Sequence, residues 1–120
     1  MPAPKPTTVE AYLASLPPAH RATASAILDH LVASFPDLEL RLAWNVPHLC
    51  RGKDHVAGLS ASKGHVSLSP WSAKVLAAHR DRLGPLEATA NLIRIPPGWK
   101  PDKPLLRSLV LGRLRELDGP

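Results

Sequence analysis

The sequence predicts an α+β fold, in which helices at both ends of the chain cover an antiparallel sheet formed by its middle. Between positions 38 and 70, apolar and polar residues alternate with the period of strands that bury one face. On both sides of this region, apolar residues recur every three or four positions, as in helices that bury one stripe. Consecutive strands between groups of helices favour an antiparallel sheet over a parallel βαβ design.

The first strand is expected over positions 38–45, followed by further short strands. Leu38, Leu40, Leu42 and Trp44 alternate there with Glu39, Arg41, Ala43 and Asn45. Pro47 should end this strand or place it at an edge, because proline donates no backbone hydrogen bond. Positions 51–54 and 62–64 have turn chemistry, and another strand is expected over 89–95.

Helices are expected before and after these strands. Thr7 or Thr8 should cap a helix over 9–16, and Pro18 should open a second one that ends near Phe35. Ser72 should cap a third helix, and the last should begin near position 104. The predicted core packs the sheet residues Leu40, Leu42, Trp44, Val66, Leu68, Ile93 and Ile95 against Ile27, Leu31, Leu109 and Val110 of the helices.

Arg113 is a charged residue within the apolar stripe of the last helix. Its guanidinium cannot lose its proton, so we expect it to donate to a carboxylate or to several backbone carbonyls. Asp37 and Glu39 are the candidate carboxylates, which makes Arg113 a structural residue, together with Trp44 and Pro47 of the first strand.

Length and composition indicate one domain. The 120 residues, 44% of them apolar, suffice for a single core over 8–120, preceded by a disordered lead-in over 1–7. Cys50 is the only cysteine, which excludes an internal disulfide. The sequence has no apolar signal region and no run long enough to span a bilayer, so we expect a cytoplasmic protein without a membrane partner. The net charge is +5, but scattered basic residues and few aromatics argue against nucleic-acid binding.

The histidines and the cysteine are the candidate metal ligands. His48 and Cys50 should lie on one face of a strand, and His65 on another strand could join them if the hairpins align. Because HxxxH, HExxH and CxxC motifs are missing, we favour their interpretation as ordinary strand residues. Without a nucleophile elbow, a phosphate loop or clustered carboxylates, the sequence does not indicate an enzyme and implies no certain cofactor.

The polar face of the sheet is the candidate ligand-binding surface. Period-two counting places on it the side chains of Arg41, Asn45, Lys63, His65 and Arg94. These residues could form a concave groove for a small anion or a protein partner. The alternative is a solvated face, which is common in antiparallel sheets.

Five segments, in this order, resemble the YdhG-like family of small bacterial domains. They are 8–18, the corner at 44–47, and the segments 63–68, 92–96 and 104–113, so the resemblance extends over 8–117. It implies an α+β domain with a curved antiparallel sheet of about five strands, backed by helices.

Some members of this family are described as frataxin-like intracellular iron chaperones. The resemblance therefore implies a non-catalytic protein that carries iron to iron-sulfur or heme assembly proteins. We expect the protein to be a monomer or a homodimer. The residues themselves predict weak or no specific ferrous binding, because the acidic side chains are dispersed and the net charge is +5.

Overall fold

The structure is a computed structural model, and it describes residues 7–119. Within this range the helices are α1 (Val9–Ala14), α2 (Pro18–Ser34), α3 (Ala73–Ala78) and α4 (Lys103–Asp118), with a 3₁₀ turn, η1 (Arg80–Arg82). The strands are β1 (Glu39–Ala43), β2 (Val46–Arg51), β3 (Asp54–Ser62), β4 (His65–Ser69), β5 (Glu87–Ala88) and β6 (Ile93–Ile95). Most of the lead-in predicted for 1–7 lies outside the described residues.

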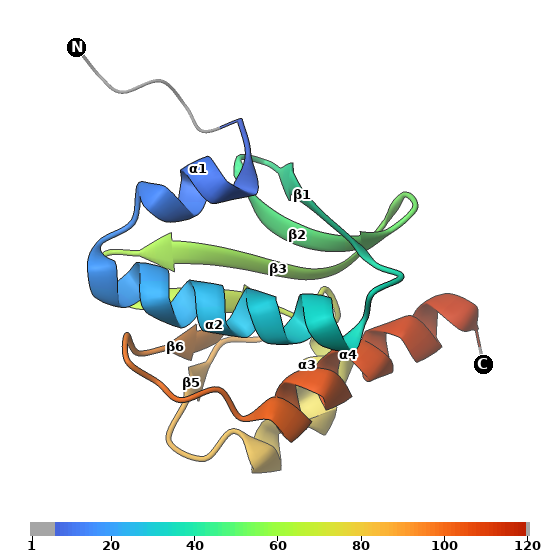
Figure 1. Ribbon diagram of the computed structural model, residues 1–120. Coiled ribbons are helices and arrows are strands. Elements are labelled where there is room, and N and C mark those ends of the chain that lie inside the picture. Colours follow the sequence, from blue (N-terminus) through green and yellow to red (C-terminus); the bar gives the residue numbers. More distant parts are fainter. Residues whose placement is uncertain (1–6, 120) are drawn as a thin grey trace.

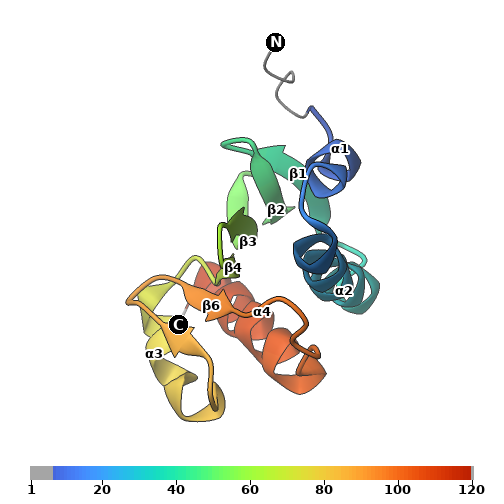
Figure 2. The ribbon, with the colours of Figure 1, turned by 90° about the vertical axis from the view of Figure 1, so that its left-hand side faces the viewer.

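The strands form one antiparallel sheet in the order β1-β2-β3-β4-β6-β5. Helices α1, α2 and α4 contact the sheet from one side, while α3 packs against α4 (Figures 1 and 2). The α+β class, the antiparallel pairing and the helices at both ends are therefore confirmed. None of the described helices combines the length and the apolar character that crossing a membrane requires.

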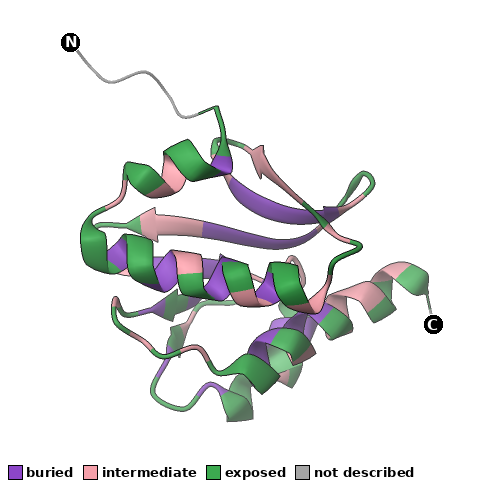
Figure 3. Ribbon diagram, viewed as in Figure 1, coloured by how far each residue is buried: buried purple, intermediate pink, exposed green. Residues whose placement is uncertain are grey.

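The apolar core lies between the sheet and these helices (Figure 3). Predicted core residues from both layers are buried, namely Ile27, Leu31, Val66, Leu68, Ile93, Ile95, Leu109 and Val110. Leu40 and Leu42 of the edge strand β1 are partly buried and pack against this core. The helix caps agree as well, because the Thr8 and Ser72 hydroxyls accept from the backbone N–H groups of Ala11 and Val75.

The prediction that Trp44 belongs to the core is wrong. Trp44 is 69% exposed, because β1 ends at Ala43 and Trp44 and Asn45 form the hairpin turn to β2. Both turn residues have positive φ, 50° and 64°, which is the signature of a type I′ turn. Pro47 is also misplaced: it neither ends the first strand nor lies at an edge, but is buried in β2, opposite Leu42.

The strand predicted over 89–95 is instead a small hairpin, which gives the described sheet six strands rather than about five. The backbone N–H of Thr89 donates to the Leu92 carbonyl at 2.8 Å. The Thr89 hydroxyl accepts from the N–H groups of Asn91 and Leu92, at 3.2 and 3.1 Å. These bonds hold 89–92 as the turn between β5 and β6, so within 89–95 only 93–95 form a strand.

Arg113 is tied to β3 and to its own helix. Its Nε donates to the His55 carbonyl at 3.0 Å, and its Nη1 lies 3.4 Å from a carboxylate oxygen of Glu116. The side chain is 19% exposed. Arg113 thus has a carboxylate partner, as expected, but the partner is Glu116 and neither Asp37 nor Glu39. Glu39 pairs with Arg41 instead.

Candidate functional site on the open face of the sheet

The sheet face opposite the core carries rows of polar residues, and we call it the open face. Residues directly opposite one another in an antiparallel sheet point to the same side. Leu59, Leu68 and Ile93 form a buried row on the core side. The neighbouring rows therefore lie on the open face: Ser60, Ser67, Arg94 and Glu87 in one, and Arg41, His48, Gly58 and Ser69 in the other.

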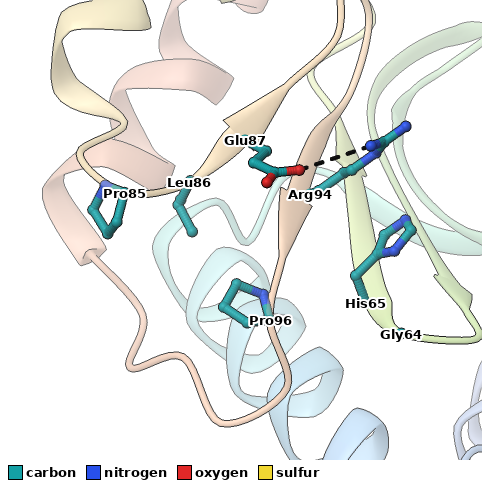
Figure 4. Close-up of a pocket in the computed structure, with 7 residues that line it drawn as sticks. All are labelled: Gly64, His65, Pro85, Leu86, Glu87, Arg94 and Pro96. Atoms are coloured by element: carbon teal, nitrogen blue, oxygen red, sulfur yellow. Dashed lines mark ion pairs between the residues drawn. The ribbon is translucent and has the colours of Figure 1, made fainter.

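A cavity of about 310 Å³ lies at the β5–β6 end of the sheet. It is lined by Gly64 and His65 at the start of β4, by 85–87, and by Arg94 and Pro96 (Figure 4). Arg94 Nη1 lies 3.8 Å from a carboxylate oxygen of Glu87, and the two side chains are 49% and 79% exposed. Such an exposed pair contributes only about 0–1 kcal/mol, so a competing anion could take the place of Glu87.

The five predicted ligand-binding residues do not share one site. Only His65 and Arg94 line the same cavity, while Lys63 is exposed in the turn between β3 and β4. Arg41 lies on β1, separated from Arg94 by three intervening strands, and Asn45 is exposed in the β1–β2 turn. The Arg41 guanidinium binds Glu39 and the Gly52 carbonyl, which holds it at its own edge of the sheet.

At the other end of the open face, the rings of Trp44, His48, His55 and Trp71 form a cluster, which we call the ring cluster. The ring centroids of His55 and Trp71 are 4.7 Å apart and nearly parallel, and those of Trp44 and Trp71 are 5.5 Å apart. The two imidazoles meet edge to face at 5.1 Å. These spacings are in the range of favourable aromatic pairs.

Local backbone geometry brings these rings together. Trp44 projects from the type I′ turn, and Trp71 follows β4 with a φ of 58°, which is unusual for a bulky residue. Gly58 of β3 lies beneath them: a Cβ atom there would stand 2.7 Å from His48 Nε2 and 3.2 Å from Trp71 Nε1. A glycine in mid-strand thus lets both rings approach the sheet.

His48 is held in one tautomer and kept neutral. Its Nδ1 lies 3.0 Å from the Val46 carbonyl, which can only accept, so Nδ1 carries the hydrogen and Nε2 keeps a lone pair. Burial lowers the pKa of His48 below its usual 6.5, and the nearby His55 lowers it further, although hydrogen bonds to the Val46 and Ala43 backbone oppose this. The imidazole is therefore a base and a potential ligand at neutral pH.

Trp71 has an indole N–H without a partner among the described residues. Its Nε1 atom is buried. A buried donor left unpaired costs about 1–3 kcal/mol, and in native proteins such groups are uncommon. This orphaned donor therefore marks the ring cluster as a place where a ligand could bind.

The predicted metal ligands are dispersed. His48 and Cys50 both belong to β2, but His65 lies on β4, with β3 in between. Cys50 is fully buried. Among residues 7–119, no group of three or more His, Cys, Asp or Glu side chains is arranged to hold a metal ion.

Sequence reasoning missed His55, Gly58, Trp71 and Glu87 as members of these sites. One signal was present: a glycine inside a predicted strand often marks a close approach to the backbone, and Gly58 does so here. The partners of that approach come from separate strands and a loop, which the alternation pattern does not reveal.

Fold and surface together define a class: a small α+β protein whose helices cover one side of an antiparallel sheet and leave the other side open. The "Intracellular iron chaperone frataxin" of Bacillus subtilis is 31% identical to the chain over 104 residues, which cover 82% of each protein. With this likeness, the chain belongs to the YdhG-like (DUF1801) family, and the resemblance seen in the sequence is confirmed. No family model matches the sequence.

Solved structures support the same assignment. The crystal structure of a DUF1801-family protein, YdhG of B. subtilis, matches with a TM-score of 0.84 and 26% identity, covering 92% of this chain and 90% of that one. An uncharacterized conserved protein from Lactobacillus casei matches with a TM-score of 0.56 and 20% identity over 92% and 93% of the two chains. The second likeness supports the fold alone.

Proposed function

We propose that this chain is a non-catalytic carrier of iron, the role stated in the name of its B. subtilis relative. The observation that carries the proposal is the 31% identity to that protein over most of both chains. Through the family resemblance, the proposed receivers of the iron are iron-sulfur or heme assembly proteins.

The ring cluster offers the best-placed donors for iron. The imidazoles of His48 and His55 meet edge to face with centroids 5.1 Å apart, and imidazole is a suitable ligand for iron. Carboxylates are less available: within residues 7–119, four already form ion pairs with arginines, namely Glu39, Glu87, Glu116 and Asp118.

Two imidazole ligands leave most of the coordination sphere of iron to water or to a partner protein. Affinity should then be modest, and the ion should exchange readily, as a carrier that delivers its cargo requires. The positive net charge of +5 should also lower the affinity for iron, because it disfavours the approach of a cation.

Anaerobic titration with ferrous iron, followed by calorimetry, tests this proposal. We expect one site with a dissociation constant between about micromolar and millimolar, weakened at least tenfold in His55→Ala. His30→Ala, which changes a half-buried histidine of α2, is the control and should leave the affinity unchanged. Absence of binding at millimolar iron would refute the carrier role, and tighter than micromolar binding would refute the two-imidazole donor set.

A second candidate function is the binding of a small anion in the cavity at His65 and Arg94. This cavity of about 310 Å³ has the size of a small-ligand site, and the Arg94 guanidinium can bind a carboxylate or phosphate. Because Glu87 occupies Arg94, Glu87→Gln should strengthen phosphate binding and Arg94→Gln should abolish it. The exposed Arg107 of α4 provides the control, Arg107→Gln. Equal phosphate affinity in all three variants would refute this function.

A further inference from the structure

We propose that a pocket beside the ring cluster binds an uncharged small molecule that carries a cis-amide group, as in a lactam. The pocket has a volume of about 180 Å³ and lies on the open face, over β2, β3 and β4. Its polar lining comes from His48, Trp71, Ser60, Ser67 and Ser69, and Gly58 contributes to its floor. This pocket shares His48 with the proposed iron site, but the ligand requires no metal, so its binding is tested on the metal-free protein and does not depend on the iron function.

Two fixed polar atoms converge over Gly58. The unpaired Trp71 N–H can only donate, and His48 Nε2, whose ring is oriented by the Val46 carbonyl, can accept. The Cβ position of Gly58 is 2.7 Å from one of these nitrogens and 3.2 Å from the other, so both border the same small volume. A cis-amide presents a C=O acceptor and an N–H donor side by side on one edge, which complements this pair.

The remaining lining favours an uncharged ligand. Val46 and Leu92 supply apolar surface, and the serine hydroxyls can either donate or accept. None of the described residues that line the pocket is an arginine, lysine, aspartate or glutamate. A charged ligand would lose hydration there without gaining a counter-charge, whereas a lactam keeps its hydrogen bonds and buries its methylene groups.

A matched pair of ligands tests the donor–acceptor requirement. δ-Valerolactam and δ-valerolactone have rings of the same size, but the lactone lacks the N–H group. Titrated into the metal-free protein, the lactam should shift the Trp71 indole N–H and Gly58 amide NMR signals, with a dissociation constant at or below the millimolar range. The lactone should bind about fivefold more weakly, as expected for one lost hydrogen bond.

Substitutions of Trp71 and Gly58 test whether these two residues are needed for lactam binding. Trp71→Phe keeps a ring but removes the N–H, and it should weaken lactam binding about fivefold. Gly58→Ala should abolish binding, because its Cβ would meet His48 Nε2 at 2.7 Å, and Gly64→Ala, with open space around its Cβ, is the control that should bind normally. If Gly58→Ala does not fold, the lactam affinity of Trp71→Phe tests the proposal by itself. Equal binding of lactam and lactone, unaltered binding by Trp71→Phe, or no spectral shift would each overturn the proposal.

Discussion

The side chains of His48 and Arg113 both depend on their surroundings in the fold. His48 was visible in the sequence as a candidate ligand, but nothing in the pattern indicated its burial, its tautomer or its closeness to His55. Arg113 was visible as a charge within an apolar stripe. The chemistry of its guanidinium indicated that Arg113 needs acceptors such as a carboxylate and a carbonyl. The sequence did not reveal that Glu116 and His55 provide them, because both contacts depend on how α4 crosses β3.

The lowered pKa of His48 predicts a pH dependence of stability. Below pH 6.5, the unfolded chain takes up a proton at this position more readily than the folded chain does. The free energy of unfolding should therefore fall as the pH drops below 6.5, until the pKa of the folded state is reached. In His48→Gln this part of the pH dependence should disappear. Urea unfolding at a series of pH values measures this dependence. If the free energy of unfolding changed equally with pH in the variant and in the parent protein, burial of His48 would not be its cause.

Arg113→Leu should lower stability, since it breaks the bond to the His55 carbonyl and the pair with Glu116. The Arg113 and Glu116 side chains are 19% and 30% exposed, so we expect a loss of about 1–2 kcal/mol, below the cost of breaking a fully buried pair. Arg107→Leu, on the exposed side of the same helix, should change stability by no more than about 0.5 kcal/mol. Thermal unfolding that gives both variants the same melting temperature would show that the contacts of Arg113 contribute nothing.

The β1–β2 hairpin shows where sequence reasoning about the elements stops. Alternation correctly identified β1, but it continued through Trp44 and Asn45 because an aromatic residue is favoured in strands. The type I′ turn requires positive φ at both positions, and Trp-Asn lacks the Asn-Gly sequence that usually signals it. The same limit applies to 89–92, where the Thr89 side chain holds a turn within an apparently extended segment.

The turn geometry predicts opposite effects of two substitutions at Asn45, whose φ is 64°. Asn45→Gly should maintain or raise stability, because glycine adopts this conformation freely. Asn45→Val should lose about 1–2 kcal/mol, because a β-branched residue is disfavoured in the left-handed region. Urea unfolding compares the two, and equal midpoints would show that this position does not need positive φ.

For the molecule as a whole, the sequence predicted the layers of the fold better than the candidate site on the open face. Apolar periodicity is local information, and it sufficed to assign most of the core to the correct strands and helices. The ring cluster combines side chains from a turn, two strands and a loop between positions 44 and 71. Such a site depends on register and on backbone conformation at Trp44 and Trp71, so it emerges only when the sheet is assembled.

We propose that ferrous iron binds to the open face at His48 and His55. Paramagnetic broadening of the backbone amide NMR signals by ferrous iron, added anaerobically, measures this most directly. We expect the broadening to be greatest around these two residues and their neighbour Trp71, and to disappear there in His55→Ala. Broadening centred instead on exposed carboxylates of the helices, such as Glu10 of α1 and Asp29 of α2, would show that iron does not bind at these two histidines.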